Sequence, residues 1–166
     1  MTVRILFGTG ADGAELAERK ERVYRDLIRQ APSYIDGAAD LVAALHAAGW
    51  RLALATSAPR ENVACVLEKF PAAALFAAKV NADMVAHSKP TPDLFLKAAE
   101  LLAVPPARCV VVEDSIAGLE AAAKADMARV GLTTTIDLAE LMTKADMVVD
   151  SLRDLTPKTF AELLSS

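Results

Sequence analysis

Apolar positions along the chain fall into two patterns, short continuous runs and longer segments with helical spacing. The continuous runs predict strands at residues 2–7, 51–55, 77–80, 109–112, 128–131 and 147–149. Segments rich in Ala, Leu, Glu and Arg predict helices at 14–30, 38–48, 60–70, 92–103, 137–143, and after residues 115 and 157. Strands without polar alternation, separated by helices, are typical of a parallel sheet covered on both faces. The sequence therefore predicts an α/β protein.

Length, charge and cysteine content narrow the class of protein. The 166 residues suit a single domain, and 54% hydrophobic residues exclude a disordered chain. A net charge of −4 argues against nucleic acid and against an anionic membrane surface as partners. The sequence shows no signal peptide and no apolar run of the ~20 residues that a membrane span needs, so we expect a cytoplasmic protein. Cys65 and Cys109 lie in apolar runs and are expected to be small core residues.

Polar side chains that could carry chemistry follow the predicted strands. Ligands of parallel sheets bind at the carboxyl ends of the strands. Glu113 and Asp114 leave a buried strand together, and two adjacent carboxylates repel each other unless a cation lies between them. Mg²⁺, a hard cation with oxygen ligands, suits this pair. A solvated turn with two acids and Ser115 as a helix cap explains the same residues equally well.

A hydroxyl pair and a lysine complete the set. Thr56 and Ser57 end a strand just before a helix, where hydroxyls and free N–H groups form a cradle for an oxyanion or phosphate. Lys89 lies in a proline-rich loop and can neutralise a phosphate together with the acids. Taken alone, the pair is more commonly a helix cap and the lysine a solvated surface residue. The order hydroxyl, lysine, acid pair at successive strand ends is more specific and matches the needs of a phosphate and magnesium site.

These motifs resemble the haloacid dehalogenase superfamily, in particular its β-phosphoglucomutase-like branch. The similar stretch runs from Glu15 to about Thr135 and includes the segments at 15–20, 52–57, 88–95 and 112–118. The resemblance implies a three-layer, Rossmann-like fold and Mg²⁺-dependent phosphoryl transfer on a small phosphorylated metabolite of the sugar phosphate class.

The resemblance also assigns roles to individual residues. Thr56 and Ser57 would hold the transferring phosphoryl group, and Lys89 would bridge that group and the nucleophile. Glu113 and Asp114 would bind Mg²⁺ directly or through water.

The sequence departs from this family at its N-terminus. The family carries a strand that ends in Asp-x-Asp-Gly, and the first Asp of this motif is the nucleophile. The cap domain of the family is also largely missing from this sequence. Aligned on Asp12-Gly13, the nucleophile position is Gly10, which has no side chain to phosphorylate. Asp12 is then at best an acid/base or a metal ligand. We treat 1–166 as one core domain in which residues 1–35 are either a remnant of the cap or a replacement first strand with its helix.

Three functions remain open from the sequence. The first is an active phosphohydrolase that uses another nucleophile or a metal-bound water. The second is an inactive member that binds phosphate and Mg²⁺ or works as an oligomer, since unpaired strand edges invite a homodimer. The third is a dinucleotide-binding protein, because Gly8, Gly10 and Gly13 match G-x-G-x-x-G formally, although no acid ends the following strand. Neither His46 nor His87 supplies the missing nucleophile.

Overall fold

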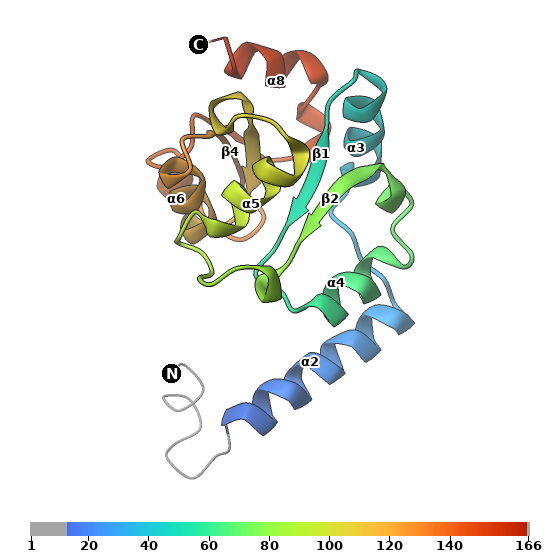
Figure 1. Ribbon diagram of the computed structural model, residues 1–166. Coiled ribbons are helices and arrows are strands. Elements are labelled where there is room, and N and C mark those ends of the chain that lie inside the picture. Colours follow the sequence, from blue (N-terminus) through green and yellow to red (C-terminus); the bar gives the residue numbers. More distant parts are fainter. Residues whose placement is uncertain (1–12, 166) are drawn as a thin grey trace.

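The computed structural model describes residues 13–165, which form parallel strands with helices between them (Figure 1). The strands are β1 (Leu52–Ala55), β2 (Phe76–Val80), β3 (Val110–Glu113), β4 (Ala128–Leu132) and β5 (Met147–Val149). The α-helices are α2 (Gly13–Gln30), α3 (Ala38–Ala47), α4 (Arg60–Leu67), α5 (Asp93–Leu102), α6 (Ile116–Lys124), α7 (Leu138–Leu141) and α8 (Pro157–Leu163). Short 3₁₀ helices lie at Ala73–Leu75, Ala82–Met84, Pro106–Arg108 and Leu152–Asp154.

The predicted α/β class is confirmed, and so are the strands and helices predicted within the described part of the chain. The predicted strand at residues 2–7 lies outside the described residues. The sequence pattern missed the 3₁₀ helices, because a three-residue turn has no periodicity to detect. Among the described helices, none is long and apolar enough to cross a membrane.

The strands form two separate parallel sheets, one with the order β1-β2 and one with the order β3-β4-β5. In the first sheet Ala55 pairs with Val80, and in the second Val112 pairs with Val130. Because all these strands are parallel, their carboxyl ends face the same edge. Neither sheet hydrogen-bonds to the other, so β1 and β3 each have one edge without a partner among the described strands.

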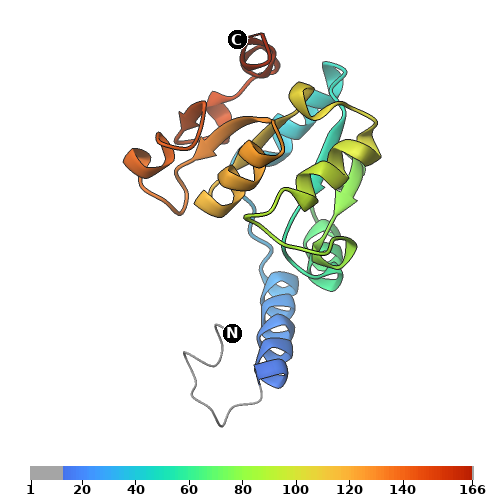
Figure 2. The same ribbon diagram turned by 60° about the vertical axis from the view of Figure 1, so that its left-hand side comes forward.

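Helices cover both faces of the strands. On one face, Leu41 and Leu45 of α3 and Phe160 of α8 share a core with Val130 and Leu132 of β4. On the other face, side chains of α5 and α6 share a core with β3; its buried members include Phe95, Ala99, Val111, Ala121 and Ala122. The result is the expected arrangement of three layers, helix, sheet and helix (Figure 2).

Helix α2 projects from this body and packs against α4 (Figure 1). The buried amide of Asn62 on α4 accepts a hydrogen bond from Arg25 Nη1 at 2.9 Å and donates one to Glu21. Lys69 Nζ donates to the carbonyl of Arg29 at 2.9 Å. Polar contacts therefore fix α2, while Val23, Tyr24 and Leu27 stay exposed.

Candidate functional site

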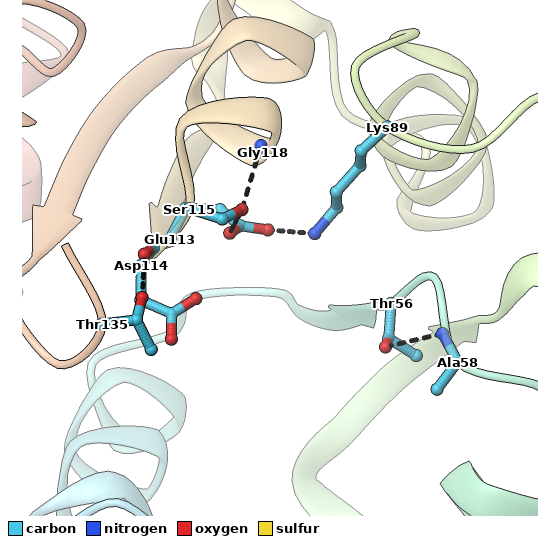
Figure 3. A network of polar contacts seen from close by, with 8 residues as sticks. All are labelled: Thr56, Ala58, Lys89, Glu113, Asp114, Ser115, Gly118 and Thr135. Carbon is cyan, nitrogen blue, oxygen red and sulfur yellow. Dashed lines mark hydrogen bonds and ion pairs between the residues drawn. The ribbon is translucent and has the colours of Figure 1, made fainter. Parts of the chain in front are cut away.

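Five of the polar residues predicted from the sequence, Thr56, Ser57, Lys89, Glu113 and Asp114, lie at or near the carboxyl ends of the strands. Thr56 and Ser57 directly follow β1, and Glu113 ends β3, with Asp114 after it. Lys89 comes from the loop before α5 and points toward the end of β3 (Figure 3). The fold therefore brings the hydroxyl, the lysine and the acids to one edge, as parallel strands require.

Glu113 is bound by neighbours of its own chain. Its carboxylate forms an ion pair with Lys89, and both side chains are largely buried, 10% and 13% exposed. Ser115 Oγ donates to Glu113 Oε2 at 2.9 Å and accepts from the backbone N–H of Gly118 at 3.1 Å, which caps α6. The Glu113 carboxylate thus lies over the first turn of α6, where the helix dipole favours a negative charge.

Gly118 makes room for this carboxylate. A Cβ atom built on Gly118 would lie 2.2 Å from Glu113 Cδ, 2.3 Å from its Oε2 and 2.5 Å from its Oε1. No such contact is tolerated between real atoms, so any side chain at this position would displace Glu113. Glycine in the first turn of α6 is therefore required by the close approach of Glu113.

Lys89 is held from two sides. Besides the ion pair with Glu113, its Nζ lies 4.9 Å from the centre of the Phe95 ring, within the range of a cation–π interaction. The loop around it is closed by Thr91, whose hydroxyl donates to the Ser88 carbonyl at 2.9 Å. The lysine is thereby positioned at the carboxyl edge, with its charge partly balanced before any ligand arrives.

Asp114 has a different environment from Glu113. It is only half-buried, and its Oδ2 accepts a hydrogen bond from Thr134 Oγ1 at 3.1 Å. Thr135 Oγ1 donates to the Asp114 backbone carbonyl (Figure 3). Glu113 is the last residue of β3 and Asp114 the first residue after it, and the two carboxylates contact different neighbours. No lysine or arginine neutralises Asp114 in the described ion pairs, and the same holds for Asp150, which follows β5.

The two hydroxyl residues after β1 have different environments. Thr56 is half-buried, and its Oγ1 accepts from the backbone N–H of Ala58 at 3.1 Å, so it shapes the turn into α4 (Figure 3). Ser57 is exposed. This turn presents the hydroxyl of Ser57 toward solvent at the carboxyl end of β1, where an anion can reach it.

The residues fit a magnesium ion only in part. Within residues 13–165 no group of three or more His, Cys, Asp or Glu side chains could hold a metal. Asp114 offers one carboxylate, while Glu113 is occupied by Lys89 and Ser115. Mg²⁺ commonly keeps several waters and is bound by one or two carboxylates plus the phosphate of a substrate. The donor set thus suits Mg²⁺ that arrives together with a phosphate.

An open cavity of about 450 Å³ adjoins Asp114 through Thr134. Its lining carries hydroxyl and carboxylate groups, from residues that include Ser33, Asp36, Thr134, Asp150 and Ser151. Asp36 is engaged by Arg153 at 2.7 Å, and hydrogen bonds from this guanidinium lower the pKa of Asp36. Tyr34, Ile35 and Leu152 add apolar surface, so the lining combines polar and apolar groups.

The remaining candidates from the sequence are either outside the described residues or apart from these side chains. Asp12 and the glycines Gly8 and Gly10 lie outside the described residues, and Gly13 is the first residue of α2. His46 is exposed on α3, and His87 pairs with Asp93 at 3.1 Å, a hydrogen bond that lowers the pKa of Asp93. Neither histidine contacts Glu113, Asp114 or Lys89 in a described hydrogen bond or ion pair. Cys65 is buried as expected, whereas Cys109 is half-buried and burial raises the pKa of its thiol.

Sequence reasoning missed Thr134 and Thr135, which hold Asp114. The signal was present, because three threonines follow the strand at 128–132 and polar side chains at this edge are informative. It also missed that Ser115 and Gly118 serve Glu113 and not only the cap of α6. That contact depends on three-dimensional packing and leaves no pattern in the sequence.

The fold defines a three-layer α/β protein of the Rossmann-like type, with polar side chains gathered at the carboxyl edge. The chain belongs to the family described as haloacid dehalogenase-like hydrolase, whose model matches residues 6–126. The family named by the sequence motifs is thereby confirmed.

Individual relatives and structures agree with this family. The chain is 35% identical over 150 residues to the β-phosphoglucomutase of Bacillus subtilis. The aligned region covers 89% of this chain and 64% of that protein. The chain thus spans less than two thirds of this relative's length. Its structure matches a family IA HAD hydrolase from Entamoeba histolytica with a TM-score of 0.88 at 26% identity, covering 98% of this chain and 76% of the other. It also matches CbbY from Rhodobacter sphaeroides in complex with phosphate, with a TM-score of 0.76 at 32% identity over 89% and 68% of the chains.

Proposed function

We propose that this chain carries the phosphate- and Mg²⁺-binding half of a phosphatase or phosphomutase that acts on a small sugar phosphate. The observation that carries the proposal is the convergence of Thr56, Lys89 and Asp114 at one carboxyl edge. Family membership supports it, as do a β-phosphoglucomutase among the relatives and a CbbY structure in complex with phosphate. The cavity beside Asp114, which polar and apolar side chains line together, offers space for the sugar part of the substrate.

Different residues would bind the phosphate and the Mg²⁺. Ser57 and the backbone N–H groups at the start of α4 receive the phosphate oxygens, with Thr56 shaping the turn that presents them. Lys89 neutralises the phosphate charge, and Glu113 holds the ammonium in place through their ion pair. Asp114 binds the Mg²⁺, which supplies charge stabilisation at the phosphoryl oxygens. Glu113 would contribute to the metal site directly or through water.

The chemistry needs a nucleophile that the described residues do not provide at this edge. Glu113 ends β3 and Asp114 follows it. Glu113 pairs with Lys89, and Asp114 is our proposed metal ligand, so neither is left as a nucleophile. Asp12, which precedes the described residues, is our proposed acid/base. The position that aligns with the family's nucleophile is Gly10, which favours a second candidate function, binding of phosphate and Mg²⁺ without turnover.

Hydrolysis of a phosphomonoester distinguishes the two functions. We would measure release of p-nitrophenol from p-nitrophenyl phosphate with and without Mg²⁺, and compare the wild-type chain with Asp114→Asn purified in parallel. The parallel variant is needed because traces of host phosphatase imitate weak activity. A Mg²⁺-dependent rate that Asp114→Asn lowers at least tenfold supports the enzyme. Equal rates in both proteins refute turnover and leave the binding function.

A further inference from the structure

The loop that carries Lys89 is fastened to its surroundings through its backbone. Thr91 Oγ1 donates to the carbonyl of His87 at 3.1 Å, which closes the loop on itself. Lys124, the last residue of α6, donates from its Nζ to the carbonyl of Pro90 at 2.9 Å. These contacts fix the backbone on both sides of Lys89, but they leave the far end of its side chain to be fixed by other groups.

Two groups restrict the ammonium of Lys89. A free lysine side chain populates many rotamers, and a ligand that binds it must overcome the entropy lost when one of them is selected. Here the Glu113 carboxylate pairs with the ammonium (Figure 3), and the centre of the Phe95 ring lies 4.9 Å from Lys89 Nζ. The Lys89 side chain is only 13% exposed, so little water competes for the ring face. A cation–π contact is stronger under these conditions than at an exposed site.

The Phe95 ring is itself held in place by the core. Phe95 lies in the first turn of α5, is 6% exposed and shares a buried cluster with Val111 of β3 and Ala121 of α6. Val111 and Glu113 are two positions apart on β3, so their side chains point to the same face of the strand. The packing that fixes the ring thus also places it on the side of β3 to which Glu113 points.

We propose that Phe95 is a positioning residue for phosphate binding and acts through Lys89, an inference that rests on the proposed function. An ion pair alone leaves the ammonium free to move around the Glu113 carboxylate, whereas contacts on two sides define one position. An ammonium has three N–H donors, so it can still donate to a ligand at the carboxyl edge after it has bonded to Glu113. Phe95 touches no ligand in this arrangement; it strengthens binding because the ammonium is ordered before the phosphate arrives.

The contact between ring and lysine can be tested without any ligand. A phenylalanine that carries three fluorine atoms on its ring, introduced at position 95 by amber suppression, keeps nearly the same shape and attracts a cation less. We expect it to raise the equilibrium constant of urea unfolding at least about threefold more in the wild-type background than in Lys89→Met/Glu113→Gln. The same replacement of Phe160, which is buried beside Trp50, should act equally in both backgrounds.

Phosphate affinity tests the positioning role. We would titrate inorganic phosphate, in the presence of Mg²⁺, into Phe95→Leu and into Phe160→Leu, since each substitution removes a buried ring. We expect the dissociation constant to rise at least about threefold in Phe95→Leu and to stay unchanged in Phe160→Leu. The fluorinated ring at position 95 should also weaken phosphate binding, although it preserves the packing. This third protein keeps the test valid where Phe95→Leu does not fold.

Three results would overturn the inference. An effect of fluorination at position 95 that is equal in both backgrounds would show that the ring does not hold Lys89. Coupling in unfolding, together with an unchanged phosphate affinity in both Phe95 variants, would show a contact that only stabilises the fold. Equal losses of affinity in Phe95→Leu and Phe160→Leu, with none in the fluorinated protein, would show a general effect of core packing.

Failure of the proposed function would give a different result. A wild-type chain that binds no phosphate, while unfolding still shows the coupling between Phe95 and Lys89, would refute the proposed function and with it any role of Phe95 in phosphate binding. The cation–π contact itself would then stand as a structural feature.

Discussion

At the scale of single residues, two adjacent acids at the end of β3 contact different neighbours. Glu113 turns toward Lys89 and the start of α6, and Asp114 turns toward the threonines after β4. The sequence predicted both as metal ligands, and that assignment stays a prediction. The geometry favours Asp114, because the carboxylate of Glu113 already accepts from Lys89 and Ser115.

Replacement of Gly118 by Ala should destabilise the protein by about 1–3 kcal/mol, as overpacking does, although Ala favours a helix. The cause is the clash of the new Cβ with the Glu113 carboxylate. Urea unfolding would measure the loss. In a Glu113→Ala background the clash is absent, so Gly118→Ala should there stabilise by about 0.5–1 kcal/mol. A loss of the same size in both backgrounds would disprove the role assigned to Glu113.

Removal of one partner of the Lys89–Glu113 pair should cost much stability. Lys89→Met leaves a buried carboxylate without its cation, for which about 3–5 kcal/mol is typical. Lys89→Met combined with Glu113→Gln should cost less than the sum of the single substitutions, because their effects are coupled. Lys158→Met removes an exposed pair with Glu162 and should change stability by no more than about 1 kcal/mol. Additive losses would mean that the buried pair is not coupled.

At the scale of elements, the strand and helix positions followed from patterns within the sequence, because apolar runs and helical spacing are local. The division into two sheets could not be predicted, since pairing joins strands that are far apart in the chain. The contact between β4 and β5 shows this long-range character. The Asp146 carboxylate, just before β5, accepts hydrogen bonds from the backbone N–H of Arg129 at 2.8 Å and from its Nε at 3.0 Å.

This contact predicts a pH-dependent contribution to stability. Hydrogen bonds from the Arg129 side chain lower the pKa of Asp146 below its usual 3.8. The contribution is therefore fully present above the unfolded pKa and is lost as the pH falls through the folded pKa. Asp146→Asn should lower the melting temperature at pH 7, and the difference from wild type should shrink below pH 3.8. Arg129→Met should show the same narrowing. A difference that stays constant down to pH 2.5, roughly a unit lower, would contradict this assignment.

At the scale of the whole molecule, the order of strands brings three separate sequence motifs to one edge. The sequence was sufficient for the family and for the residues of this edge, because each motif follows a strand that local patterns reveal. It could not give the hydrogen bonds of Thr134 and Ser115, which arise only when distant loops meet. The family model places the chain among the haloacid dehalogenase-like hydrolases, and β1 and β3 each have one edge without a partner among the described strands.

We propose that Asp114, Lys89 and the turn after β1 bind phosphate and Mg²⁺ together. Isothermal titration of inorganic phosphate into the chain, with and without Mg²⁺, measures this coupling. We expect Mg²⁺ to strengthen phosphate binding at least tenfold in the wild type, since each ligand supplies contacts to the other. Asp114→Asn should abolish this gain, while Lys89→Met should weaken phosphate binding with or without the metal. Phosphate binding that is absent, or that responds equally to Mg²⁺ in Asp114→Asn, would refute the proposed site.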